Sequence, residues 1–221
     1  MKFMKLKQHH IKMLFSVFEE RGYELQEFNN VGLLNMADVG KDIFNDITLW
    51  FTETEGEAYQ STLNPAKQSF LKGGLAGIGA PVLTRKQHRN MDCIDLHGKR
   101  KIESFCNRPN TRVSDGKYAG CFLQEVQRDT NRDFCLENEI IQTGYFGMNI
   151  HSASTLKEVF HIGYYGEGCW VTRNHKNHLR HIAAAKNTDM YLKNPEVTLF
   201  HRTGFDHTEL ISLYKDFYGG V

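Results

Sequence analysis

Apolar residues recur every three to four positions near the N-terminus, from residue 11 to residue 18, with Lys and Glu on the opposite face. This spacing predicts an amphipathic helix over residues 8–22, and Gly22 is a suitable residue to end it. The same reasoning predicts a helix over residues 174–186 and a closing helix over residues 209–217.

From Val31 onward the pattern changes to short apolar runs bounded by Gly, Asn and Asp, which is typical of β-strands. Strands are predicted over residues 33–39, 47–51, 78–83, 117–126, 146–150 and 196–201. The chain contains no repeat and no low-complexity linker. We therefore expect a single α+β domain over residues 1–221, mainly β. It would consist of an N-terminal helical segment (1–30), a β-rich core (31–205) and a C-terminal helix (206–221).

Composition narrows the class of protein. The 221 residues include 27 basic and 26 acidic side chains, so the sequence does not favour a nucleic-acid binder that works by bulk charge. No apolar run approaches the roughly 18 residues of a membrane span, and the basic N-terminus lacks a signal-peptide cleavage site. Five widely spaced cysteines without a C-x-x-C pair argue against a disulfide framework and a zinc ribbon. We expect synthesis in the cytoplasm without a signal peptide.

The strongest candidate chemistry is a histidine followed 18 residues later by a cysteine. His151 ends the predicted strand 146–150 on the same face as Asn149. Gly168 directly precedes Cys169 and allows the backbone to approach closely there. A histidine beside a cysteine can deprotonate the thiol near neutral pH, and the Cys169 N–H could stabilise the oxyanion of an acyl-transfer intermediate. The alternative is that both residues are structural, with Cys169 a small buried hydrophobe.

The Asn-Ile-His-Ser run at 149–152, followed by Gly-Glu-Gly-Cys at 166–169, resembles the catalytic signature of L,D-transpeptidases of the YkuD type. It is also similar to small phage and prophage proteins with the same two elements, and weaker similarities extend from about residue 10 to residue 200. The resemblance implies a YkuD-like β-sandwich or barrel core that forms a cysteine thioester on peptidoglycan stem peptides, without a cofactor. The implied catalytic residues are Cys169, His151, Ser152 and Gly168.

The candidate substrate-binding residues are Asn149, Trp170 and Arg173. Trp170 is expected in the core or in the pocket wall, and it would point to the face opposite Cys169 if this segment is a strand. The sequence departs from the family at the arginine that normally lies two residues after the cysteine and holds a substrate carboxylate. That position is Val171 here, and Arg173 lies four residues after the cysteine. A phage-like origin favours hydrolysis during lysis or infection, by a virion-associated protein or one released to the cell wall.

Three rival interpretations remain open at this point. The departures from the family motif fit a non-catalytic virion or accessory protein that keeps the fold. A zinc-dependent peptidase could use His151, His161 and Cys169 as ligands. A nucleic-acid-associated protein could use the basic residues between positions 85 and 101.

Two other clusters of residues are candidates to bind a metal ion or an anion. Asp129, Asn131 and Asp133 alternate as in the start of a calcium loop, with Glu137 or Glu139 as a further ligand; an Asx-rich turn gives the same pattern. Histidines at positions 175, 178 and 181 recur every third residue of a predicted helix. No carboxylate lies near them in sequence, which favours a solvated helix face over a zinc site.

Overall fold

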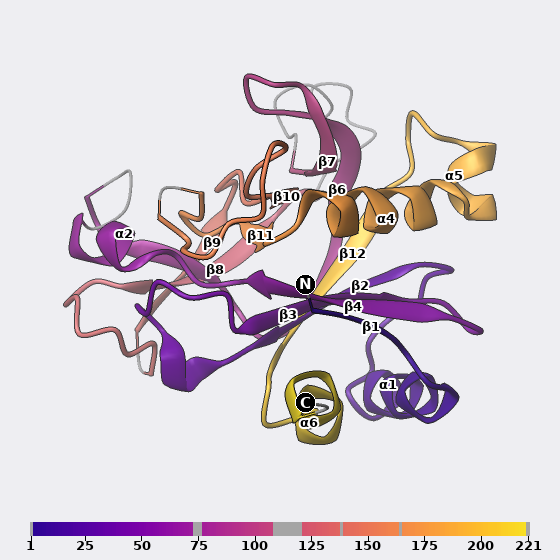
Figure 1. Cartoon of the computed structure of the whole chain (residues 1–221), viewed down its shortest axis with the longest axis horizontal. Helices are drawn as coiled ribbons and strands as arrows, with labels where there is room; N and C mark the ends of the chain where they lie inside the picture. The colour runs from indigo at the N-terminus through magenta and orange to yellow at the C-terminus, as the bar shows by residue number, and fades with distance from the viewer. Residues whose placement is uncertain (1, 73–76, 108–120, 138, 164, 220–221) are drawn as a thin grey trace.

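The fold is described by a computed structural model, which defines residues 2–72, 77–107, 121–137, 139–163 and 165–219 (Figure 1). Strands outweigh helices in it, so the expected class, α+β and mainly β, is confirmed. None of the described helices is both long and apolar enough to cross a membrane.

A closed barrel forms the centre of the molecule. The strands of its sheet are β1 (Phe3–Lys5), β2 (Asn29–Leu34), β3 (Asp46–Phe51), β4 (Gly56–Thr62), β6 (Gln87–His97), β7 (Ile102–Cys106), β10 (Ile150–Ser152), β11 (Trp170–Thr172) and β12 (Phe200–Asp206). Eight of them follow in the order β4, β11, β10, β7, β6, β12, β2, β3, and β3 pairs back onto β4 to close the ring. β1 pairs with the part of β4 that β11 leaves uncovered. Closure leaves the barrel strands without the free edge that invites aggregation.

A small second sheet and several helices surround the barrel. The sheet contains β5 (Ala80–Leu83), β8 (Gln124–Asp129) and β9 (Ile140–Gly144). The described helices are α1 (Gln8–Glu20), α2 (Lys67–Lys72), α4 (His175–Lys186), α5 (Asp189–Lys193) and α6 (Ile211–Gly219), with a 3₁₀ turn η1 at Met36–Asp38.

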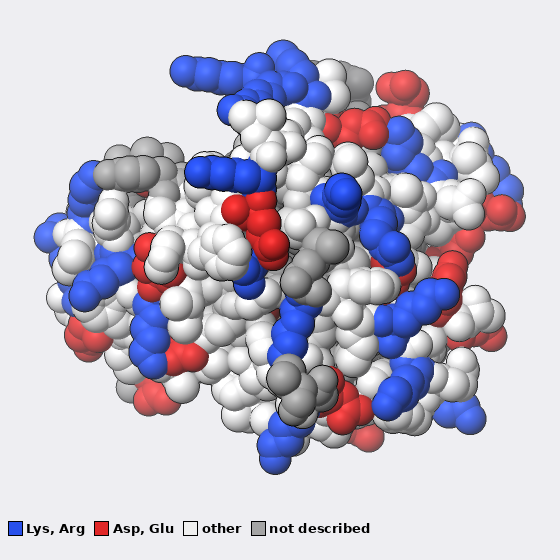
Figure 2. All heavy atoms as spheres, viewed as in Figure 1, with Lys and Arg blue, Asp and Glu red and all other residues white. Residues whose placement is uncertain are grey.

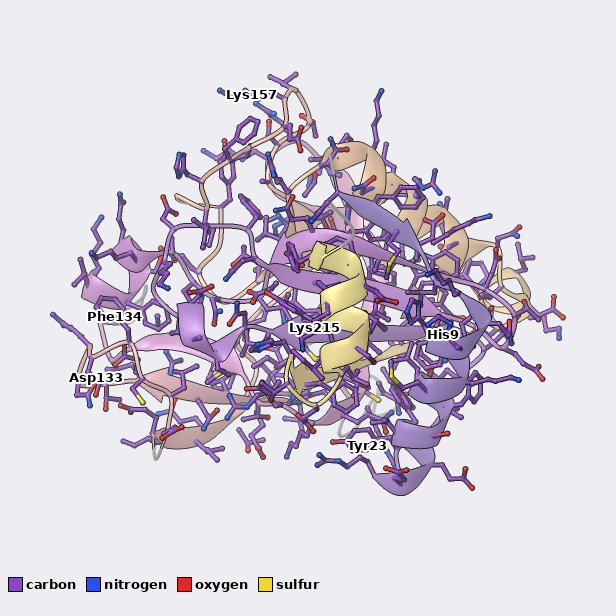
Figure 3. All side chains as sticks on the ribbon, turned by 60° about the horizontal axis from the view of Figure 1, so that its bottom comes forward. His9, Tyr23, Asp133, Phe134, Lys157 and Lys215 are labelled. Atoms are coloured by element: carbon purple, nitrogen blue, oxygen red, sulfur yellow. The ribbon has the colours of Figure 1, made fainter. Side chains whose placement is uncertain are left out.

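Both faces of the central strands are buried, because helices cover the barrel from two sides. Every residue of β2 and β3 is buried. On one face α1 and α6 lie side by side and bury residues such as Phe18 and Leu213 (Figure 3). On the other, α4 buries Ile182 in a separate cluster with Phe105 and Trp170 (Figure 1). Strands buried on both faces read as continuous apolar runs.

All three predicted helices are present, as α1, α4 and α6. Gly22 follows the end of α1 with a φ of +63°, as a helix-ending glycine does. The Asn174 side chain accepts the N–H groups of Lys176 and Asn177 and thereby caps α4. The predicted strand at 47–51 matches β3, and the one at 78–83 overlaps β5.

Four predicted strands are displaced or partly undescribed. The strand expected at 33–39 is wrong after Leu34, because the Asn35 side chain accepts the Ala37 N–H and begins the 3₁₀ turn instead. The strand expected at 196–201 begins only at Phe200, and the one at 146–150 begins only at Ile150. Of the strand expected at 117–126, residues 117–120 lie outside the described part, and β8 begins at Gln124.

Candidate active site

A parallel strand pair brings the candidate histidine and cysteine together. β10 and β11 pair in parallel with Ile150 opposite Trp170, and the Trp170 N–H donates to the Asn149 carbonyl at 2.9 Å. Cys169, just before β11, therefore lies beside Asn149, just before β10. His151 is two residues further along β10, so both side chains reach the same end of the pair.

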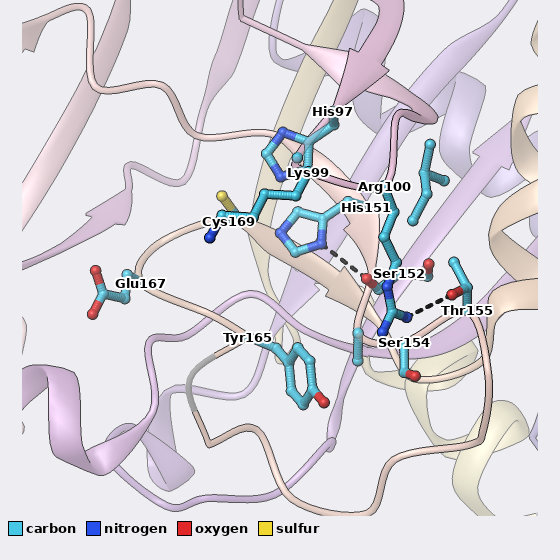
Figure 4. A pocket seen from close by; sticks show the side chains of 13 residues that line it. His97, Lys99, Arg100, His151, Ser152, Ser154, Thr155, Tyr165, Glu167 and Cys169 are labelled. Carbon is cyan, nitrogen blue, oxygen red and sulfur yellow. Dashed lines mark hydrogen bonds between the residues drawn. The ribbon is translucent and has the colours of Figure 1, made fainter.

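These side chains open into a pocket of about 470 Å³ (Figure 4). One wall comes from the end of β6 and the turn into β7, and the other from β10, the loop after it and the residues just before β11. The lining residues include His97, Lys99, Arg100, His151, Thr155 and Cys169.

The Cys169 thiol is partly exposed in this pocket and is held by backbone groups. The Asn149 N–H donates to its sulfur at 3.3 Å, and the sulfur faces the Gly147 carbonyl at 4.0 Å. Burial raises the pKa of the thiol, and the Asn149 N–H opposes this only in part. The expected thiolate near neutral pH is therefore disfavoured by the surroundings, and the resting group is a thiol.

His151 is oriented as a neutral base. Its Nδ1–H donates to the Ser152 carbonyl at 3.0 Å, which leaves Nε2 as the acceptor nitrogen. Figure 4 shows that the Nε2 side of the ring turns toward Cys169. Burial lowers the pKa of His151, so the imidazole is uncharged at neutral pH. The backbone carbonyl of Ser152 thus fixes the orientation of the His151 ring.

A second histidine, His97, belongs to the same site. Its ring lies 4.7 Å from the His151 ring, centroid to centroid, in a stacked arrangement. The Asn149 side-chain amide donates to His97 Nδ1 at 3.2 Å. Asn149 therefore contacts the sulfur through its backbone and the second imidazole through its side chain. Sequence reasoning placed His97 only in a basic run, because it comes from a strand more than 50 residues earlier.

The turn before the cysteine requires glycine. Gly168 has a φ of +112°, and a Cβ there would lie 2.7 Å from the Pro81 carbonyl oxygen. Within the described residues, the N–H groups of Gly168 and Cys169 donate to no protein acceptor. Both amides are therefore free to bind the oxygen of a carbonyl that is attacked at the sulfur.

None of the three candidate substrate-binding residues lines the pocket. Trp170 is 1% exposed and points into the barrel, where the guanidinium of Arg202 lies 5.0 Å from its ring. Arg173 pairs with Glu158 at 3.2 Å and donates to the Gln60 side chain at 2.7 Å. Neither side chain is placed to contact a substrate beside Cys169. Asn149, the third candidate, is nearly buried. Its backbone N–H donates to the Cys169 sulfur, and its side-chain amide donates to His97.

The zinc alternative finds no support in the described residues. No three His, Cys, Asp or Glu ligand atoms of that part of the chain gather at this pocket. His161 is exposed and lies 3.9 Å from Asp42, outside the pocket lining.

The Asp129–Asp133 loop uses its oxygens to hold its own backbone. The Asp129 carboxylate accepts the N–H groups of Asp133 and Phe134. The Asn131 side chain accepts the Asp133 N–H at 3.0 Å, as in an Asx turn. Carboxylate atoms of Asp129, Asp133 and Glu139 lie within 4.8 Å of one another, so Glu139 is the residue placed to join a cation here.

The expected solvated histidine face on α4 is wrong. His178 and His181 are fully buried and donate to the Glu103 carbonyl and the Asn30 side chain, at 2.8 and 2.7 Å. His175 bonds the Ser152 hydroxyl at 2.9 Å. The face is internal because α4 packs these rings against the barrel.

The basic residues between 85 and 101 divide into two groups. Lys86 and Arg89 pair with Glu125 and Glu24, so their charge is neutralised. Lys99 and Arg100 instead project from the tip of the β6–β7 hairpin, where basic side chains gather at the top of Figure 2.

Comparison with known proteins identifies no relative of this chain. No family model, no curated protein and no solved structure matches this chain. The functional argument therefore rests on the residues and geometry of the site.

Proposed function

We propose that this protein is a cysteine-dependent acyl-transfer enzyme that acts on peptidoglycan stem peptides, with hydrolysis as the main outcome. The observation that carries the proposal is the parallel β10–β11 pair, which opens Cys169 and a correctly oriented His151 into one pocket. The motif resemblance, with its YkuD-type fold, supplies the substrate class. A phage-type enzyme that reaches the cell wall fits that resemblance.

Cys169 would attack an amide carbonyl while its proton passes to His151 Nε2. A bond forms between the sulfur and the carbonyl carbon, and the N–H groups of Gly168 and Cys169 bind the oxyanion. Collapse of this intermediate breaks the C–N bond, and His151 gives its proton to the leaving amine. Water then attacks the thioester, its proton passes through His151 to the sulfur, and a carboxylic acid leaves.

The surrounding residues support these roles. The Ser152 carbonyl holds the His151 ring in the tautomer that accepts a proton at Nε2. The stacked His97 ring and Asn149 restrict movement of His151 and Cys169. Fixed positions of this kind are what a nucleophile and its base require.

The test compares the unmodified protein with its Cys169→Ala variant on purified peptidoglycan, with muropeptides identified by mass spectrometry. The matched control is Cys135→Ala, which removes an exposed cysteine that follows the Asp129–Asp133 loop. We expect a new product from the unmodified protein and from Cys135→Ala, and none from Cys169→Ala. The mass of the product identifies the bond.

Two other results would contradict the proposal, and the first of them would favour the non-catalytic accessory role. Absence of product, together with no alkylation of Cys169 by iodoacetamide at pH 9, would refute the enzyme proposal. Product formed equally by Cys169→Ala would refute the assignment of the nucleophile.

A further inference from the structure

A loop beside the pocket holds two large apolar side chains in solvent. Leu156 is 81% exposed and Phe160 is 65% exposed, and both lie in the segment between β10 and β11. No described large apolar side chain is more exposed than these two. In Figure 3 this segment projects from the body of the molecule, with Lys157 at its tip. Contact of such side chains with water is unfavourable, so a partner that covers them gains binding energy.

The loop is anchored to the protein on its inner side. Val159 and Ile162 are buried in one cluster with Phe44. The Gly163 N–H donates to the Asp42 carboxylate at 2.7 Å. The two apolar side chains are therefore presented outward from a fixed backbone.

Arg173 supports the Phe160 ring from below. Its guanidinium lies 4.2 Å from the centroid of that ring, a distance typical of a cation–π contact. The same guanidinium pairs with Glu158 at 3.2 Å, so the acidic residue of the loop is neutralised. The loop therefore presents apolar surface without free negative charge from Glu158.

Positive charge without a counter-ion lies next to this loop. Lys99, Arg100 and Lys101 occupy the exposed turn between β6 and β7, where basic side chains gather in Figure 2. Arg100 donates to the Thr155 hydroxyl at 2.8 Å, so the turn contacts the loop directly. None of these three residues, nor Lys157, forms an ion pair with a described residue. The pocket opens between the turn and the loop (Figure 4).

We infer that the Lys99–Lys101 turn and the loop residues Leu156, Lys157 and Phe160 form a docking surface for an anionic lipid bilayer. Lipid phosphates attract the basic side chains, and the two apolar side chains insert at the boundary of the acyl chains. An anionic polysaccharide or a nucleic acid fits the basic turn but leaves Leu156 in water. The inference goes beyond the proposed function, because it concerns the rim of the pocket and not the chemistry inside it.

The test measures sedimentation of the protein with vesicles of phosphatidylcholine, alone or mixed with phosphatidylglycerol. We expect binding to the mixed vesicles and little binding to phosphatidylcholine alone. Leu156→Asn should weaken binding roughly 10- to 100-fold, the range for burial of one leucine side chain. Lys157→Gln should weaken it about fivefold, the effect of one basic residue at an anionic surface.

Two matched control variants should bind as the unmodified protein does. Leu25→Asn replaces an exposed leucine next to Glu24, whose N–H bonds Gln87 at the start of β6, the end opposite the basic turn. Lys12→Gln removes an exposed lysine from α1, which lies on the other side of the barrel in Figure 1.

Leu156→Trp tests insertion directly. The native Trp50 and Trp170 are 4% and 1% exposed, so they stay inside the protein. Vesicles of phosphatidylglycerol and brominated phosphatidylcholine should quench the emission of the added tryptophan. Leu25→Trp should show no more quenching than the unmodified protein.

Several results would overturn the inference. Absence of binding to the mixed vesicles would do so, as would an added tryptophan at position 156 that is not quenched. Binding that Lys157→Gln weakens and Leu156→Asn does not would show a polyanion site without insertion. Cys169→Ala should bind vesicles as tightly as the unmodified protein, so this inference and the proposed function can fail independently.

Discussion

Replacement of Gly168 by Ala tests whether the turn before Cys169 sets the position of the sulfur. The backbone there has a φ of +112°, outside the left-handed region that L-residues tolerate. The added Cβ would lie 2.7 Å from the Pro81 carbonyl oxygen and 3.0 Å from the end of the Met148 side chain. Pro81 belongs to β5, which is paired with β8, so this carbonyl cannot easily give way.

The expected loss of stability has two parts. Backbone strain at such a residue costs about 1–3 kcal/mol, and overpacking adds about 1–3 kcal/mol. The sum, about 2–6 kcal/mol, exceeds the effect of the matched control, Gly22→Ala. Gly22 has a φ of +63° and open space around its Cα, so only the left-handed cost of roughly 1–2 kcal/mol applies.

Relief of the clash would move Cys169 as well. A displacement of about 1 Å at a nucleophile can lower the rate about 100-fold. Urea unfolding measures the first effect, and peptide cleavage measures the second. We expect Gly22→Ala to keep full activity. If Gly168→Ala is no less stable than Gly22→Ala and cleaves at the unmodified rate, the assignment of this turn to the catalytic geometry is wrong.

Two further predictions concern buried charge. Burial lowers the pKa of His178 to about 3. Just below pH 6.5 this histidine therefore takes up a proton only in the unfolded chain, and the free energy of unfolding falls by about 2 kcal/mol at pH 5. His178→Gln, which keeps an N–H donor for the Glu103 carbonyl, should remove that part of the pH dependence in urea unfolding; an unchanged difference between pH 7 and pH 5 would contradict this. Arg202→Met leaves the fully buried Asp92 carboxylate unpaired, which should cost about 3–5 kcal/mol and lower Tm by roughly 6–20 °C. A second change, Asp92→Leu, should recover part of that loss in thermal unfolding, and no recovery would contradict the pairing.

The helices were predictable because their signals are local. The 3.6-residue spacing of α1 and the Asn174 cap of α4 lie within a few residues of the elements they define. The inward face of α4 was not predictable in the same way. His178 and His181 resemble a polar surface in sequence, and their burial depends on acceptors far along the chain, the Glu103 carbonyl and the Asn30 side chain, which satisfy the two rings.

Several barrel strands show no clear alternation of apolar and polar residues. β6 (Gln87–His97) contains buried Asp92, which a sequence pattern assigns to the surface. The partner of Asp92 is Arg202 on β12, 110 residues away in the sequence. The ion pair that permits the burial of Asp92 therefore cannot be read from the local sequence. β10 and β11 have three residues each, too few for an alternating pattern to stand out.

Only part of the candidate site could be predicted from the sequence, because some of its features are local and others depend on long-range contacts. Glycines before Cys169 and the strand end at His151 are local features. His97 and Arg100 come from a hairpin that only the closed barrel brings to the β10–β11 pair. Trp170 is a candidate substrate-binding residue by its position after Cys169, but strand alternation predicts that it points away from the cysteine, and in β11 it turns into the barrel.

The protonation state of the resting pair follows from burial and has a consequence for reactivity. Burial raises the pKa of Cys169 and lowers that of His151, so proton transfer before substrate binds would create two charges in a partly desolvated site. We therefore expect transfer to accompany attack on the carbonyl, when the N–H groups of Gly168 and Cys169 stabilise the oxyanion.

Alkylation of Cys169 by iodoacetamide in the free protein should accordingly be slow at pH 7. Its rate should rise about tenfold per pH unit and still be rising at the ordinary thiol pKa of about 8.5, because only the thiolate reacts and burial raises the pKa of Cys169. His151→Ala should leave this alkylation profile nearly unchanged, since the thiol is not paired with an imidazolium, yet it should abolish peptide cleavage. An alkylation rate that already reaches its plateau below pH 7, and that falls in His151→Ala, would show a preformed thiolate–imidazolium pair and refute the neutral pair.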